Sequence, residues 1–299
     1  MRKKDNFIGW LLFGAVGFVI YKILTDEDNS IYAQDVKQIP DLSKMKFGVA
    51  YPIMSLSLLD SELEEKKKHI RDLNTITAGQ LLIQLDENNG NLTVRRMAEN
   101  FLYPKAVFMI YLLISNPSFQ LEIRNRKNDD YRIFPNNNAG TGHTKVIAPL
   151  LKKGKTNGSL IVIDRNDDEN AIYHLENEDG SSPTPTPGNL SSYRVLRHEL
   201  IHAYRNLTRR SLNKQDVVKV YTGKLSLRQI PKTIGMEESL AVGRIKNKFG
   251  EFIGIQIHED FELKFSKFEN KIPFNEAIFT KERNREKVRE AYRVEYHGL

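Results

Sequence analysis

The longest uninterrupted apolar stretch of the chain lies at its N-terminus. Phe7 to Leu24 reads FIGWLLFGAVGFVIYKIL and carries one charge, Lys22. A helix of that length rises about 27 Å, close to the hydrocarbon thickness of a bilayer. Basic residues precede the stretch and acidic residues follow it, so the positive-inside rule places residues 1–6 in the cytoplasm. We therefore predict a single-pass transmembrane anchor over 7–24, with a cleaved signal peptide and a buried helix as alternatives.

The pattern after the anchor predicts a tether followed by one folded domain. Residues 25–55 are assigned to the tether and 56–299 to the domain. Leu59 to Leu73 has the apolar spacing of an amphipathic helix, and an Asn-Asn-Gly turn follows at 88–90. Thr93 to Asn116 contains nine consecutive apolar residues, AVFMIYLLI, which are too few to cross a bilayer. That segment is therefore predicted to be a buried element.

The middle of the chain predicts two strands and then a helix. Ser159 to Ile163 is a short β-branched run after an Asn-Gly pair, which is typical of a buried strand, and Ala171 to His174 is a second, shorter candidate. Three alternating prolines favour an extended backbone and exclude a helix before Gly188 (Pro183, Pro185 and Pro187). Ser191 or Ser192 can then cap a helix that runs to about Asn206.

Composition narrows the classes of function. The 299 residues are 40% hydrophobic, which is enough for a substantial core, and the formal charge of +7 favours acidic partners or anionic lipid. Basic residues are not interleaved with aromatic residues, so we predict no nucleic-acid partner. The chain has no cysteine. Disulfide scaffolds, cysteine-ligated metal and a thiol nucleophile are therefore excluded.

The helix predicted before Asn206 carries an HExxH motif. His198 and His202 are four residues apart and share one helical face, where two neutral imidazoles can bind one Zn²⁺. Glu199 then takes the position of a general base. An apolar stripe anchors one side of this helix, the two histidines share a neighbouring face, and the other side is predicted to be polar (Leu196, Leu200, Ala203 and Leu207 form the stripe). The alternative is two surface histidines on a solvated face. The other five histidines lack partners at ligand spacing and are assigned to structural or exposed positions (His69, His143, His174, His258 and His297).

A catalytic zinc ion needs a third protein ligand. The ligand set of the metzincins, HExxHxxGxxH, is not present, because Arg205 and Thr208 occupy the positions of its glycine and third histidine. Gly235 to Gly250 is predicted to form a helix, and Glu238 opens its apolar face, where an unpaired carboxylate would be costly. We therefore predict Glu238 as the third ligand and Glu237 as its neighbour orienting a histidine. The order of the two glutamates stays open, as does the alternative of two exposed acids at a helix N-terminus.

The C-terminus supplies candidates for stabilising an oxyanion. Lys281 to Tyr296 has the pattern of a helix, on which four arginine and tyrosine residues share one face (Arg289, Tyr292, Arg293 and Tyr296). Such side chains can donate hydrogen bonds to the charge that develops on a scissile carbonyl oxygen. A basic amphipathic helix without catalytic function is the alternative.

The motifs HELIHAYRN and MEESLAVG together resemble the NleD-like family of bacterial effector zinc metallopeptidases and, more distantly, the light chains of clostridial neurotoxins. Arg293-Val294-Glu295-Tyr296 is similar to a later Arg-x-x-Tyr element of that family. The resemblance implies an α+β, zincin-like fold with a small twisted sheet, an active-site helix and a glutamate-bearing helix. It also implies that Arg293 and Tyr296 are catalytic and that the substrate is a protein, such as a host signalling protein.

These observations predict a membrane-anchored, zinc-dependent endopeptidase of effector or toxin-like type. Its N-terminus would be cytoplasmic and its catalytic domain would lie across the membrane, or the protein would be secreted or delivered to a host cell. Two alternatives remain open. One is a membrane-anchored interaction protein whose zinc site is structural or inactive, and the other is a zinc hydrolase of non-peptide amides.

Overall fold

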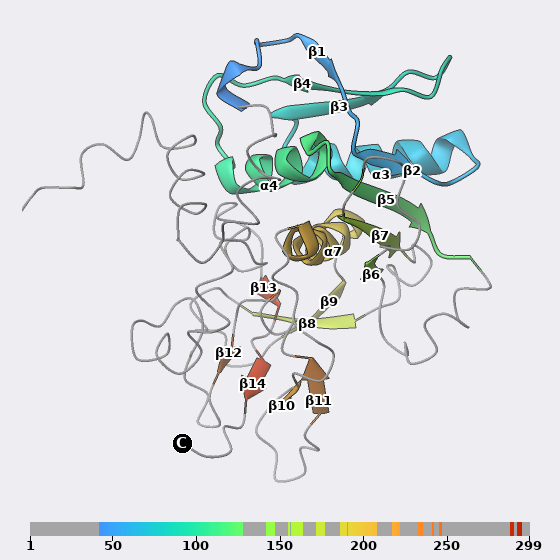
Figure 1. The fold of residues 1–299 in the computed structure, drawn as a ribbon. Helices are drawn as coiled ribbons and strands as arrows, with labels where there is room; N and C mark the ends of the chain where they lie inside the picture. The colour runs from blue at the N-terminus through green and yellow to red at the C-terminus, as the bar shows by residue number, and fades with distance from the viewer. Residues whose placement is uncertain are drawn as a thin grey trace, which may run out of the picture.

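The computed structural model describes residues 42–127, 142–146, 155, 157–163, 172–176, 186–189, 191–207, 217–221, 232–235, 241, 245–246, 288–289 and 292–294. Within these residues the chain forms helices and several small sheets, so the predicted α+β class is confirmed (Figure 1). The predicted anchor at 7–24 and tether residues 25–41 lie outside them. No helix within the described part of the chain is long and apolar enough to cross a membrane.

The first sheet is an antiparallel three-stranded sheet in the order β1-β4-β3, formed by Ala50–Pro52, Leu92–Arg96 and Leu81–Leu85. The predicted turn at 88–90 joins β3 to β4, and Gly90 has the positive φ of 74° that such a turn needs. A short 3-10 helix, η2 (Leu42–Lys44), precedes β1, and Leu42 and Met45 are buried in the core. The folded part therefore begins at least as early as residue 42, within the segment expected to be tether.

The second sheet has the order β2-β5-β7-β6, formed by Leu56–Leu58, Phe119–Asn125, Asn157–Ile163 and Gly142–Val146. The pairs β2/β5 and β5/β7 are parallel, whereas β6 runs antiparallel to β7. The predicted strand at 159–163 is confirmed as the larger part of β7, and most of its residues are buried. Because β5 and β6 pair with opposite sides of β7, it is an interior strand, and among the described residues β6 forms the edge beside it.

Three helices contact this second sheet. They are α3 (Leu63–Ile76), α4 (Pro104–Ser115) and α7 (Ser192–Leu207), and α3 and α4 also contact α7. The nine apolar residues predicted to be buried form the centre of α4. The helix expected from Leu59 starts later, at Leu63, because the preceding residues 56–58 pair with β5 instead. Figure 1 shows α7 in the middle of the molecule, beneath α4 in that view.

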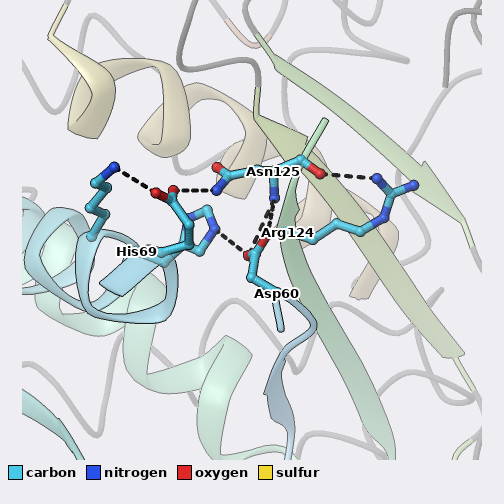
Figure 2. Close-up of polar contacts among 6 residues, drawn as sticks. Asp60, His69, Arg124 and Asn125 are labelled. Carbon is cyan, nitrogen blue, oxygen red and sulfur yellow. Dashed lines mark hydrogen bonds and ion pairs between the residues drawn. The ribbon is translucent and has the colours of Figure 1, made fainter. Parts of the chain in front are cut away.

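A buried polar network holds the connection between β2 and α3 (Figure 2). The Asp60 carboxylate accepts hydrogen bonds from His69 Nε2 at 2.9 Å and from the backbone N–H of Asn125 at 3.0 Å. The backbone N–H of Leu59, just after β2, donates to the carbonyl oxygen of Ile123 in β5. The Asp60 side chain, one residue later, therefore extends the hydrogen bonding between these two segments beyond the end of β2. His69 is fully buried, which confirms the structural role predicted for it.

Two further sheets come from the second half of the chain. One has the order β13-β8-β9 (Val288–Arg289, Ile172–Glu176 and Thr186–Asn189). It contains the predicted short strand near 171–174 and keeps Pro187 extended, as expected. The other has the order β11-β10-β14-β12 (Lys232–Gly235, Val217–Tyr221, Tyr292–Val294 and Ile245–Lys246).

These sheets correct two predicted helices. The helix expected over 281–296 is wrong where the structure describes it, because β13 and β14 are strands and β14 pairs with both β10 and β12. The helix expected over 235–250 cannot span that range, because Gly235 ends β11 and Ile245–Lys246 form β12. Ala241, between them, is helical and buried as predicted. Partners far away in the sequence override the local helical spacing in both segments.

Candidate metal centre

The N-terminus of α7 is fixed by a capping residue and by a contact with α3. The carbonyl oxygen of Ser191 accepts hydrogen bonds from the N–H groups of Arg194 at 2.8 Å and Val195 at 3.3 Å, so Ser191 takes the predicted capping position. The hydroxyl of Ser192 donates to Asp72 Oδ1 of α3 at 2.9 Å. The entry point of the helix is therefore tied to a second helix.

The C-terminus of α7 is fixed to β7. Asn206 Nδ2 donates to Ser159 Oγ at 2.9 Å, and Asn157 Nδ2 donates to the carbonyl oxygen of Asn206 at 2.5 Å. The first bond is buried, where an unmade hydrogen bond is costly. Together with the Ser192 contact, these bonds hold both ends of the helix that carries HExxH. No sequence signal predicted them, because Ser159 and Asn157 lie almost fifty residues before Asn206.

The helix is buried on nearly all sides. The predicted apolar stripe is buried throughout (Leu196, Leu200, Ala203 and Leu207). The rest of the helix is also largely covered: His198 is 7% exposed, Glu199 is 6% exposed, and His202 is partly accessible. The side predicted to be polar carries polar side chains, but most of these side chains are buried. The alternative of two surface histidines on a solvated face is contradicted by the same burial.

The two motif histidines converge at their ring nitrogens. His198 Nε2 and His202 Nε2 are 3.1 Å apart, and the two rings meet edge to face with centroids 4.7 Å apart. This is the geometry that an i, i+4 pair on a helix can reach when both rings turn toward one point. A direct N–H···N hydrogen bond between two neutral rings fits the distance, and so does a shared cation.

The distance fits a tetrahedral zinc ion. Zn–N bonds of 2.0–2.1 Å at a tetrahedral angle place two ligand nitrogens about 3.3 Å apart. The observed 3.1 Å between the two Nε2 atoms needs only a slightly narrower angle. Neutral imidazole is a preferred zinc ligand, and the low exposure of His198 and Glu199 gives the dry surroundings of a metal site. The spacing of these two histidines therefore fits two of the ligand positions of this metal.

A comparison of the chain with protein-family models and with curated proteins finds no match. The resemblance to NleD-like metallopeptidases therefore rests on the motif residues themselves. Of these residues, His198, Glu199 and His202 lie on α7 and Arg293 lies in β14.

The predicted third ligand lies beyond what the structure describes. Glu237 and Glu238 fall between Gly235, the end of β11, and the helical residue Ala241, and neither is among the described residues. Within the described residues no group of three His, Cys, Asp or Glu side chains could hold a metal ion. The assignment of Glu238 as ligand and Glu237 as its neighbour thus stays a prediction.

The residues predicted to stabilise an oxyanion do not share a helix where the structure describes them. Arg289 lies in β13, Tyr292 and Arg293 lie in β14, and Tyr296 is outside the described residues. Spacing of i, i+3, i+4 and i+7 does not define a common face in extended backbone. Catalytic roles for Arg293 and Tyr296 therefore rest on the resemblance alone. Of the other histidines, His143 and His174 lie in β6 and β8, and His258 and His297 lie outside the described residues.

Proposed function

We propose that this protein is a membrane-anchored, zinc-dependent endopeptidase that hydrolyses a protein substrate. The observation that carries the proposal is the 3.1 Å approach of His198 Nε2 and His202 Nε2, with buried Glu199 beside them on a helix held at both ends. A structural histidine pair has no need of a buried carboxylate in the motif position of a general base, whereas hydrolysis does. The zincin-like fold and the effector-like role belong to the same proposal and are supported by the motif resemblance.

In this proposal, His198, His202 and Glu238 hold the zinc ion. When bound, zinc polarises a carbonyl group and lowers the pKa of water toward neutrality. The carboxylate of Glu199 removes a proton from the attacking water and later delivers that proton to the nitrogen of the departing amine. Arg293 and Tyr296 donate to the developing oxyanion, a contribution that is typically a hundred- to a thousandfold in rate, or about 3–4 kcal/mol.

The position of β6 supports an extended polypeptide as substrate. It borders β7 on one side and contacts α7, and within the described residues no strand pairs with its other side. A substrate added as a further strand would run past the helix that carries the histidines. The strand at 159–163 cannot take this role, because it pairs with β5 and β6 on its two sides.

One alternative is favoured by a specific observation. Low exposure of His198 and Glu199 is also what a structural zinc site would show, as expected for a membrane-anchored interaction protein. Such a protein would bind zinc and unfold more readily on chelation, and it would cleave nothing. Metal content and cleavage must therefore be measured on the same preparations.

The decisive experiment compares four forms of the full-length chain in detergent: wild type, Glu199→Gln, His202→Gln and a control, His258→Gln. Elemental analysis measures the zinc bound per chain, and mass spectrometry of a proteome-derived peptide library measures cleavage. We expect zinc in all forms except His202→Gln. Cleavage should occur in wild type and His258→Gln, and Glu199→Gln should be slower by about a hundred- to ten-thousandfold.

The two parts of the proposal fail separately. Cleavage by Glu199→Gln at the wild-type rate would refute the role of Glu199 as general base, but it would not refute zinc binding. Wild-type protein without zinc would end the metal centre. Zinc in wild type without any cleavage would favour the structural alternative, and cleavage of small amides but no peptides would favour the non-peptide hydrolase.

A further inference from the structure

Three large apolar side chains are exposed together at one end of the β1-β4-β3 sheet. Phe47, Met97 and Leu102 are 59%, 40% and 78% exposed, and we refer to them as the apolar corner. Phe47 forms a β-bridge with Arg96, the residue before Met97. The backbone N–H groups of Met97 and Leu102 both donate to Gln80, at 2.9 Å to its carbonyl oxygen and at 2.6 Å to its Oε1. Segments far apart in the sequence are thus joined at this corner.

The corner has a defined shape. The guanidinium of Arg96 donates to the carbonyl oxygens of Ala98 at 2.9 Å and Ser43 at 3.3 Å, and it lies 5.3 Å from the ring centroid of Phe101. These contacts join η2, the end of β4 and the segment leading to α4. Figure 1 shows these three segments at the same end of the β1-β4-β3 sheet. Exposed apolar side chains on a fixed frame mark an interaction surface.

The sequence segments that form the apolar corner are rich in basic residues. Residues 42–50 and 95–105 contain five basic side chains and one acidic side chain, Glu99. The five are Lys44, Lys46, Arg95, Arg96 and Lys105, and the three lysines are exposed. Apolar side chains that enter the acyl boundary, ringed by cations that meet phosphate, are the composition of a surface that binds anionic lipid.

The predicted membrane anchor lies close to the apolar corner in the sequence. The predicted spanning segment ends at Leu24, and seventeen residues, 25–41, separate it from Leu42 of η2. Seventeen residues can bridge at most about 60 Å. The apolar corner follows a few residues later, so tethering gives it a high effective concentration at the membrane surface.

We propose that the apolar corner docks on the anionic surface of the membrane in which the N-terminal segment is anchored. Docking sets the orientation of the folded domain, with the β1-β4-β3 sheet toward lipid and the later sheets on the far side of α7 away from it (Figure 1). The inference rests on the predicted anchor and is independent of the metal site.

The absence of cysteine allows a direct test with single labels. Asn100→Cys, beside the corner, and Asn88→Cys, in the turn at the other end of the β3–β4 hairpin, are matched exposed asparagines. Each full-length variant is labelled with nitrobenzoxadiazole and placed in nanodiscs of phosphatidylcholine with phosphatidylglycerol. We expect blue-shifted emission and quenching by spin-labelled lipid at position 100 and little of either at 88. Both signals should weaken in phosphatidylcholine alone or at high salt.

A second variant separates docking from proximity. Phe47→Ser with Leu102→Ser should reduce quenching at position 100 to the level at 88, while circular dichroism stays unchanged because both residues are exposed. Equal quenching at 88 and 100 in the starting variants overturns the proposal. Shielding of position 100 that persists in neutral discs and after both substitutions means that other parts of the chain cover the corner. Crosslinking between two copies through position 100 means that a second chain covers it. Either result also overturns the proposal.

Discussion

Replacing Asp60 with alanine tests how the connection between β2 and α3 is held against β5. The substitution removes the acceptor of two hydrogen bonds, from His69 Nε2 at 2.9 Å and from the backbone N–H of Asn125 at 3.0 Å. The Asp60 side chain is 9% exposed and His69 is fully buried. Water can therefore replace these bonds only poorly, and His69 must remain in its place in the core.

The expected loss of folding stability follows from the two hydrogen bonds that the substitution removes. A hydrogen bond to a charged group contributes roughly 1.5–3 kcal/mol. Allowing for partial rehydration of the truncated site, Asp60→Ala should lower the free energy of unfolding by about 3 kcal/mol. Asp60→Asn keeps one acceptor oxygen for Asn125 N–H and should cost about 1 kcal/mol. Glu64→Ala on the same stretch of chain removes a 73% exposed carboxylate paired with Lys67 and should cost less than about 0.5 kcal/mol.

The pH dependence has a definite sign. Burial of the Asp60 carboxyl raises its pKa, but the hydrogen bonds from His69 and Asn125 N–H outweigh burial, with electrostatic help from His69 and Lys127. The pKa therefore lies below its usual value of 3.8. Stabilisation by the carboxylate is complete above that value and disappears as the pH falls through the folded-state pKa. The difference between wild type and Asp60→Ala should therefore stay constant from neutral pH toward 3.8 and shrink as the pH falls below that value.

Urea unfolding followed by circular dichroism measures these differences. The full-length protein in detergent is unfolded at neutral and acidic pH for wild type, Asp60→Ala, Asp60→Asn and Glu64→Ala. A neutral-pH cost of Asp60→Ala no larger than that of Glu64→Ala would refute the role given to the buried network. A cost that grows on acidification would refute the assigned direction of the pKa shift.

Three further outcomes are expected. Leu200→Ala, at a fully buried position of α7, should lower stability by about 2–5 kcal/mol, whereas exposed Leu102→Ala should cost under about 0.5 kcal/mol in the same unfolding assay. Ser159→Ala removes the acceptor of the Asn206 side chain and should cost about 1–3 kcal/mol; a cost near zero shows that this bond does not hold α7 to β7. Chelation should abolish cleavage by wild type and added zinc should restore it; unchanged cleavage in chelator contradicts a catalytic metal.

Local patterns predicted the elements whose decisive interactions are local or strongly apolar. The helix from Ser192 to Leu207 follows from its cap, its apolar stripe and the prolines before it, and the approach of His198 to His202 follows from helical spacing. The centre of α4 and the strand within β7 follow from runs of apolar residues long enough to need burial but too short to span a membrane.

The predictions failed where partners come from elsewhere in the chain. Tyr292–Val294 has helical spacing but forms a strand, because β10 and β12 offer backbone donors and acceptors on both sides. The start of α3 moved to Leu63 because residues 56–58 pair with β5. Burial of Glu199 could not be read from the helix pattern either, because other elements cover the face on which it lies.

The amino-acid sequence by itself determined that two imidazoles and a carboxylate share one helix, since hydrogen bonds within a helix join residues four apart and set the spacing of its faces. Tertiary structure alone decided that most of this helix is buried, that β7 is paired on both sides, and that Asp60 accepts a hydrogen bond from the backbone of β5. Strand pairing and burial depend on which distant segments meet, and no local pattern contains that information.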